Sequence, residues 1–153
     1  MLNIVNADID PNILFEQVLI NNFKLIILLI IGGFLFGIPT IVNLFVNGLN
    51  FALLMKIAFS CGISVEQFIL LTMPHGVFEI PAIIFGGAAG FKIPFEVVRY
   101  LLGRKNKVLT KEDLREFLTL SLIAIVLIIV AAWIEAYVTS DLAKSIIEKS
   151  QLG

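Results

Sequence analysis

Long apolar runs separated by short polar stretches cover most of the chain, and this pattern predicts membrane-spanning helices. The first charge-free run, Leu25–Met55, has 31 residues, so as a single helix it would extend about 46 Å against roughly 30 Å of hydrocarbon. It must therefore bend or turn, and the Asn47-Gly48 dipeptide is the strongest turn signal inside it. We predict a turn at Val46–Asn50, with Pro39 kinking the helix before it.

The rest of the chain completes an all-α polytopic membrane helical bundle of about four spans. Asp10-Pro11 indicates a helix start within an amphipathic surface segment. The third span is expected to be a broken helix, because Pro74 and Pro81 each lack an N–H and clash with the preceding turn, with Gly76 between them. The predicted single membrane domain, residues 1–153, comprises a surface segment at 1–21, spans at 22–45, 51–73, 74–91 and 117–138, and a basic loop at 92–116.

Composition excludes several classes of protein. Hydrophobic residues make up 59% of the chain and charged residues 15%, against roughly 45–50% and about 25% in soluble domains. The net charge of −1 provides no basic field, so no nucleic-acid partner is expected. Cys61 is the only cysteine and cannot form an intrachain disulfide. We expect a multi-pass protein of the cell membrane whose surroundings are the lipid bilayer.

Positive charge is concentrated in one part of the chain and predicts the orientation. Seven of the eleven Lys and Arg residues fall within 92–116, namely Lys92, Arg99, Arg104, Lys105, Lys107, Lys111 and Arg115. The positive-inside rule places this loop in the cytoplasm, and four spans then place both termini outside. The Thr110-Lys-Glu-Asp113 motif is typical of a capping box and predicts the start of the last helix.

The only histidine lies in apolar sequence, four residues before Glu79. A histidine and a carboxylate are costly in lipid, and the i, i+4 spacing places His75 and Glu79 on one helix face. If the chain turns at Pro74, then Glu66 on the preceding span lies at nearly the depth of Glu79. We therefore predict one polar cluster formed by these three side chains.

Two interpretations of this cluster remain open. It is either a functional site that binds a metal or handles protons, or a structural knot in which His75 and Glu79 satisfy each other and the carbonyls freed by the prolines. The structural interpretation is favoured. One histidine with one or two carboxylates is a poor ligand set for a structural zinc ion, which takes four donors. No catalytic residue, metal or cofactor is predicted.

Two pairs of glycines have the spacing that lets membrane helices approach closely. They are Gly33 with Gly37 and Gly86 with Gly90. Such contacts suit packing within one subunit or within a homo-oligomer.

Several motifs occur here in one order: Asn21-Asn22, Gly33-xxx-Gly37, Asn47-Gly48 and Pro74-His75-Gly76-xx-Glu79-xx-Ala82. Together they resemble the stage II sporulation protein M family over roughly Asn21–Phe91. The resemblance implies an integral membrane protein that, in spore formers, is the membrane-anchored partner of two cell-wall hydrolases without being catalytic itself. Relative to that namesake, this shorter chain is expected to lack the first span and most of the extracytoplasmic loop after it. The resemblance therefore applies to the membrane core.

The expected function is that of a non-enzymatic membrane scaffold or assembly subunit with protein partners of unknown identity. One alternative is a small transporter-like or channel-like protein that uses the broken third helix, since broken helices near polar residues recur at transporter substrate sites. A third interpretation is a metal-dependent membrane enzyme.

Overall fold

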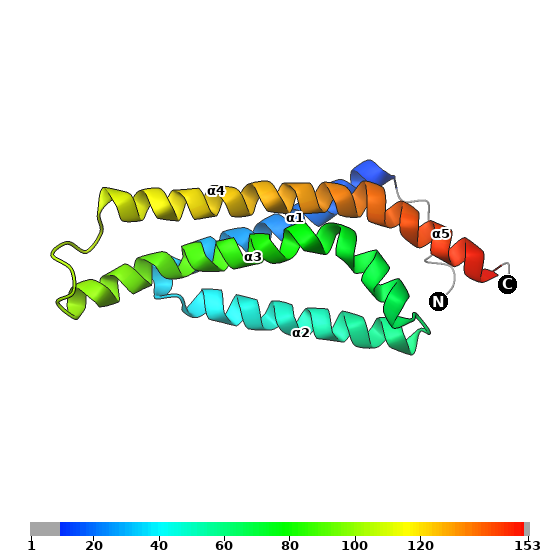
Figure 1. Ribbon diagram of the computed structural model, residues 1–153, viewed down its shortest axis with the longest axis horizontal. Coiled ribbons are helices and arrows are strands. Elements are labelled where there is room, and N and C mark those ends of the chain that lie inside the picture. Colours follow the sequence, from blue (N-terminus) through cyan, green and yellow to red (C-terminus); the bar gives the residue numbers. More distant parts are fainter. Residues whose placement is uncertain (1–9, 152–153) are drawn as a thin grey trace.

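The computed structural model describes residues 10–151, which are almost entirely helical (Figure 1). The elements are α1 (Pro11–Ile31), the 3₁₀ segment η2 (Gly32–Leu35), α2 (Ile38–Ser60), α3 (Val65–Leu101), α4 (Lys111–Ile134), the π-helical segment η3 (Glu135–Thr139) and α5 (Ser140–Gln151). Four helical stretches are long and apolar enough to cross a membrane, namely Pro11–Leu35, Ile38–Ser60, Val65–Leu101 and Lys111–Ser145. The predicted all-α, four-span class is confirmed.

Helix α1 begins where the sequence predicts a start. The carboxylate of Asp10 accepts a hydrogen bond from the backbone N–H of Asn12 at 2.8 Å, and Pro11 occupies the first turn, where its missing N–H costs nothing. The helix then continues without a break into the first span, so the described part of the predicted surface segment and the span form one element. Residues 1–9 of that predicted segment lie outside the described part of the chain.

The predicted turn at Val46–Asn50 is wrong, because this stretch lies in the middle of α2. The chain turns earlier, at Phe36 and Gly37, where φ is +56° and +76°. Pro39 then falls in the first turn of α2, a position that needs no N–H. Asn47 lies within this helix, and its side-chain amide donates to the carbonyl oxygen of Asn43, one turn earlier, at 3.1 Å.

The predicted boundary between the second and third spans at Pro74 is also wrong. The turn lies between α2 and α3, where Gly62 has a φ of +86°. There the hydroxyl of Ser64 accepts a hydrogen bond from the N–H of Gln67 while the Gln67 side chain accepts one from the N–H of Ser64. This capping box starts α3 ten residues before Pro74.

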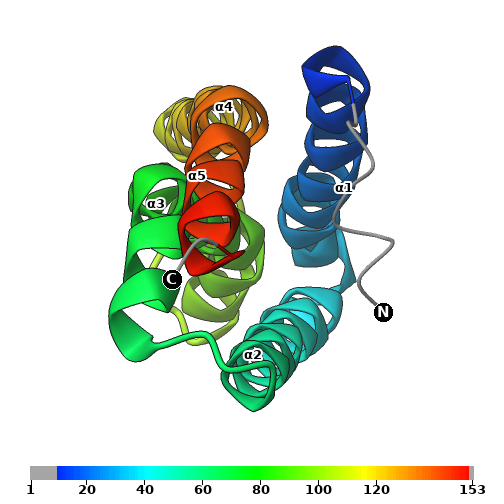
Figure 2. The same ribbon diagram turned by 90° about the vertical axis from the view of Figure 1, so that its right-hand side faces the viewer.

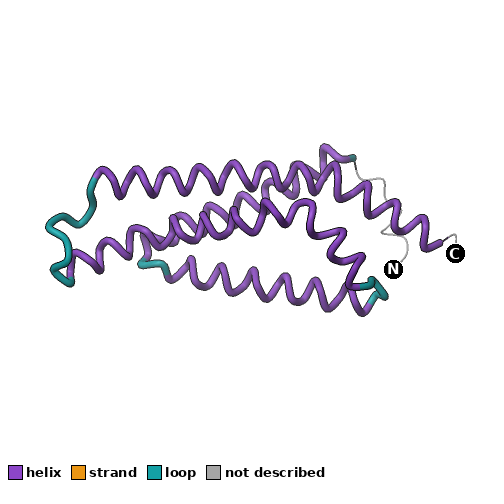
Figure 3. Tube along the Cα trace, in the orientation of Figure 1, coloured by secondary structure: helices purple, strands orange, loops and turns teal. Residues whose placement is uncertain are grey.

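Pro74, Gly76 and Pro81 therefore lie inside one long helix. Helix α3 is continuous through them, and Figures 1 and 3 show it bent near its start instead of broken. A membrane helix tolerates internal prolines because neighbouring groups and local adjustments satisfy the freed carbonyls. The expected broken helix is thus a bent one.

The basic loop is shorter than predicted. Helix α3 continues to Leu101 and α4 begins at Lys111, so the loop is confined to residues 102–110. The predicted capping box is present: the hydroxyl of Thr110 accepts from the N–H of Asp113, and the Asp113 carboxylate accepts from the N–H of Thr110. The predicted range 92–116 thus includes the last turns of one helix and the first of the next.

The buried core is formed by α1, α3 and α4, and its buried hydrophobic residues are Leu25, Ile26, Leu29, Ile30, Ala82, Ala89, Phe117, Ala124 and Ile128. Helix α2 lies on the far side of α1 and α3 from α4 (Figure 2). Only Thr40 of α2 is buried. Three helices therefore make the bundle, and the fourth lies against it near one end.

Glycines allow the close contact between α1 and α3. A Cβ added at Gly90 would collide with the backbone carbonyl oxygen of Leu29, and one added at Gly33 would collide with that of Gly90. A Cβ at Gly86 would meet Ile26 at 3.4 Å. Gly37 differs from these three, because it forms the turn before α2 in a left-handed conformation.

Candidate functional site

A polar cluster lies where α3 passes the π-helical segment η3. His75 of α3 lies with its Nδ1 atom 3.2 Å from the hydroxyl oxygen of Thr139, at the end of η3. Both side chains are half-buried. The partner of His75 is therefore on another helix, 64 residues along the chain, and the predicted pairing of His75 with Glu79 is not among the hydrogen bonds of the described residues.

Each of the two elements carries a carboxylate one turn away from this contact. Glu79 follows His75 on α3, and Glu135 precedes Thr139 at the start of η3. Both are half-buried, and the charge of Glu79 acts on Glu135. A π-helical turn inserts one extra residue per turn and is often found at functional sites. Here it places Glu135 and Thr139 on the same side of the helix, toward α3.

Asn22 of α1 is a buried polar group about one turn from Glu79 along the bundle. Helices α1 and α3 run in the same direction (Figure 1). Because Gly86 lies against Ile26, Ala82 lies level with Asn22 one turn earlier. The Asn22 side chain is only 9% exposed and makes no hydrogen bond to another described residue.

Glu66 does not join this cluster. It lies exposed in the first turn of α3, nine residues before His75 on the same helix, or about 14 Å along a straight axis. The prediction of a cluster with Glu66 depended on a turn at Pro74, and that turn does not exist.

We define the α3–η3 cluster as His75, Glu79, Glu135 and Thr139. Among the described residues, no three His, Cys, Asp or Glu side chains come close enough together to hold one metal ion. The cluster offers an imidazole and two carboxylates that can exchange protons, and a hydroxyl that can donate and accept hydrogen bonds.

A second polar cluster lies at the opposite end of the bundle, beside the basic loop. Glu96 of α3 is 1% exposed and receives hydrogen bonds from Lys92 at 3.0 Å and Lys105 at 2.7 Å. Arg99 approaches the same carboxylate at 3.3 Å. Lys105 also pairs with Asp113 of α4. This network ties the end of α3, the loop and the start of α4 together.

The sequence interpretation missed Glu96, Glu135, Thr139 and Asn22. Glu96 had a usable signal, since Lys92 and Arg99 lie at i−4 and i+3 from it on a helix. Glu135 and Thr139 had none, because only the packing of α4 against α3 brings them to His75. Asn22 follows Asn21 at the edge of the predicted first span and has no local feature that distinguishes a buried amide from an exposed one.

Comparison with known proteins identifies relatives of the whole membrane core. The family model of stage II sporulation protein M matches residues 3–140. An uncharacterised protein of Methanocaldococcus jannaschii is 46% identical over 138 residues, which cover 87% of this chain and 76% of that protein. A second uncharacterised protein of the same organism is 35% identical over 108 residues, which cover 68% of this chain but about half, 49%, of that relative.

No solved structure matches the chain. The family match extends beyond the motifs between Asn21 and Phe91 to include α4 and η3, and therefore contains both polar clusters. The chain belongs to the stage II sporulation protein M family.

Proposed function

We propose that the protein is a non-enzymatic assembly subunit of the cell membrane, which holds a helix of another membrane protein against α2. In this proposal it crosses the membrane four times, with the basic loop in the cytoplasm, as the concentration of Lys and Arg there favours. The protein partner is recognised by helix packing in lipid and not by catalysis.

The exposed inner face of α2 supports this proposal. Thr40 is buried and its hydroxyl donates to the carbonyl oxygen of Leu29 at 2.9 Å, which marks the side of α2 that faces the bundle. Leu54 lies 14 residues later, close to four full turns, and so on about the same side. Yet Leu54 is 57% exposed. The inner face of α2 is thus uncovered around Leu54, although Phe51 and Phe59 pack against Phe68 of α3.

A second observation concerns the polar groups on this helix. Asn43 donates to the carbonyl oxygen of Leu25 at 3.4 Å, and Asn47 bonds back to Asn43. Asn50, next along the same stripe, is exposed and makes no side-chain hydrogen bond to a described residue. An unpaired asparagine amide on a membrane helix favours association with another helix.

Site-specific photo-crosslinking tests the assembly function. A photoreactive residue at Leu54 should yield a discrete protein adduct in native membranes, because a partner helix lies there. Leu49 is the matched control, since it is 54% exposed and lies about two and a half turns after Thr40, on the opposite face. Adducts with lipid alone at Leu54, or equal protein adducts at both positions, would contradict the proposal.

A second candidate function is proton transfer through the α3–η3 cluster. It is favoured by the histidine and the two half-buried carboxylates that α3 and η3 bring together at the depth of the spans. Ionisable groups inside membrane bundles mark proton paths in many transporters.

Flux measurements separate the two candidates. If the cluster conducts protons, proteoliposomes carrying a pH-sensitive dye should acidify faster than empty ones, and Glu79→Gln should abolish the difference. Glu66→Gln is the matched control, because it removes an exposed carboxylate from the same helix. A rate equal to that of empty liposomes would exclude proton transfer and leave the assembly function.

A further inference from the structure

The basic residues near the loop fall into two groups. Lys92, Arg99 and Lys105 are paired with the acids of the Glu96 network. The second group is exposed, and no member has an ion pair with a described residue; it consists of Arg104, Lys107, Lys111 and Arg115. These four positive charges at the loop end of the bundle are therefore exposed and are not neutralised by a described acid.

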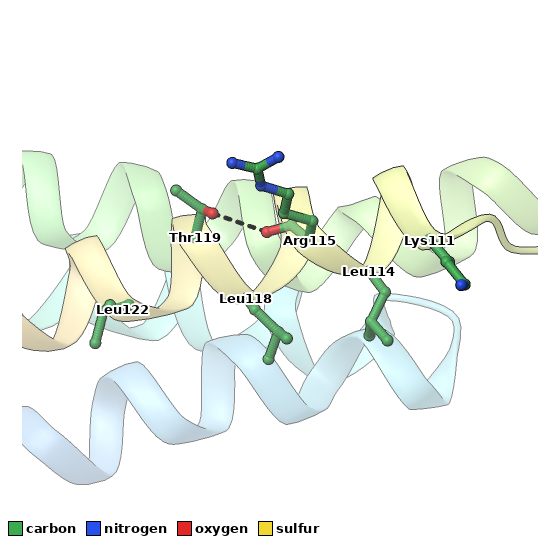
Figure 4. A pocket seen from close by; sticks show the side chains of 6 residues that line it. All are labelled: Lys111, Leu114, Arg115, Leu118, Thr119 and Leu122. Atoms are coloured by element: carbon green, nitrogen blue, oxygen red, sulfur yellow. Dashed lines mark hydrogen bonds between the residues drawn. The ribbon is translucent and has the colours of Figure 1, made fainter.

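Two residues of the unpaired group lie on the edge of an apolar groove. The groove is a shallow, open hollow of about 340 Å³ on the outer surface of α4, and this one helix supplies all of its lining. Its lining residues are Lys111, Leu114, Arg115, Leu118, Thr119 and Leu122. Figure 4 shows the three leucines in a row along one side of α4, with Arg115 and Thr119 on the other side and Lys111 at the loop end.

The acids nearby do not neutralise these two charges. Asp113 is held by Lys105, and Glu116 accepts a hydrogen bond from Lys92. Glu112 is exposed and is not within ion-pair distance of either Lys111 or Arg115. The groove therefore combines two available cations with a strip of leucine side chains.

The dimensions of the groove match one leaflet of a bilayer. From Leu114 to Leu122 the helix rises about 12 Å, against roughly 15 Å for half of the hydrocarbon thickness. Lys111 lies at the loop end of the strip, and Arg115 lies one turn further along α4, on the side opposite the leucines (Figure 4). A molecule that fits must carry a negative group at the interface and an apolar chain that runs toward the bilayer centre.

We infer that this groove is a binding site for one anionic phospholipid. Lys111 and Arg115 hold the phosphate of the headgroup, and Leu114, Leu118 and Leu122 line the upper part of an acyl chain. Arg115 suits phosphate because its guanidinium offers two parallel N–H donors. The site is independent of α2 and of the α3–η3 cluster, so it does not depend on the proposed assembly function.

Native mass spectrometry after incubation with equal amounts of phosphatidylglycerol and phosphatidylcholine tests the site. The parent protein should retain one phosphatidylglycerol molecule in preference to phosphatidylcholine. In the double variant Lys111→Gln/Arg115→Gln the preference should fall by roughly 25-fold, the product of two basic contacts that each contribute about fivefold. All four basic residues in question are exposed, so the variants should fold like the parent, as circular dichroism can verify.

The matched control is Arg104→Gln/Lys107→Gln, which removes the same charge from the loop without touching the groove. It should keep the preference. An equal loss in both double variants would show that the loop attracts anionic lipid only through its general charge, and would overturn the inference.

A second measurement tests the acyl-chain part of the site. Inorganic phosphate in millimolar excess should not displace the retained lipid, because phosphate cannot occupy the leucine strip. Displacement by phosphate would show an anion site without a lipid chain and would also overturn the inference.

Discussion

Replacing Glu96 by alanine should lower the free energy of unfolding by about 3 kcal/mol, the low end of the range for breaking a buried ion pair. Glu96 is 1% exposed and pairs with Lys92, Arg99 and Lys105 at once. Without its carboxylate these cations lose their shared partner and repel one another where α3 meets the loop. Unfolding in mild detergent with increasing denaturant measures the loss.

Two further variants make this result specific. Glu116→Ala removes the 59% exposed member of the same network, and we expect less than about 1 kcal/mol, as for other exposed ion pairs. Glu96→Gln keeps the shape and one acceptor, so its stability should lie between those of the parent and the alanine variant. A Glu96→Ala protein as stable as the Glu116→Ala protein would show that the network contributes nothing.

The network should be insensitive to moderately alkaline pH. Lys105 donates hydrogen bonds to Asp113 and to Glu96. These two bonds, the one to Asp113 having the larger effect, hold the pKa of Lys105 above its ordinary value. The contribution of Lys105 is therefore fully present below about pH 10.4, its pKa in the unfolded chain, and is lost only as the pH rises through the raised value. The difference between parent and Glu96→Ala should thus be the same at about pH 7 and about pH 9.

The sequence was sufficient to predict the fold class and those helix ends that are formed by local chemistry. Asp10 and Thr110 both cap the helix that follows them, as predicted, because capping needs only side chains two or three residues away. The four spans follow from the lengths of the apolar runs. None of these features depends on how the helices pack.

The turns between the first three spans were predicted wrongly for a physical reason. In water, Asn-Gly and proline usually end a helix, but in lipid an exposed backbone is so costly that the helix continues through them. Asn47 and Pro74 accordingly lie within helices. The capping box at Ser64 and Gln67 was the better signal, because it satisfies backbone N–H groups at the helix end.

The partners in the α3–η3 cluster could not be predicted from local spacing. His75 and Glu79 share a helix face as expected, but the hydrogen-bond partner of His75 is Thr139, and the charge of Glu79 acts on Glu135. These contacts depend on the register of α4 against α3 and on the π-helical turn at Glu135–Thr139. A prediction from spacing finds which residues are costly in lipid, but not which helix satisfies them.

A substitution at Gly90 should cost about as much stability as Glu96→Ala, because α3 touches the backbone of α1 at Gly90. Gly90→Ala should destabilise the protein by about 1–3 kcal/mol, the usual cost of overpacking, because the added Cβ would collide with the carbonyl oxygen of Leu29. It would also lie 2.8 Å from the hydroxyl oxygen of Thr40, which donates to that same carbonyl. One methyl group therefore disturbs the contacts among three helices.

Gly48→Ala is the matched control for this variant. Gly48 also lies inside a helix, but a Cβ there would meet no atom within 4 Å. Alanine favours helix over glycine by about 1 kcal/mol, so Gly48→Ala should be neutral or stabilising while Gly90→Ala is destabilising. Both variants are compared with the parent by denaturant unfolding in the same detergent. If Gly90→Ala gains stability as Gly48→Ala does, then α1 and α3 are not held in backbone contact, and the level of Asn22 relative to Glu79, which is derived from that contact, is wrong as well.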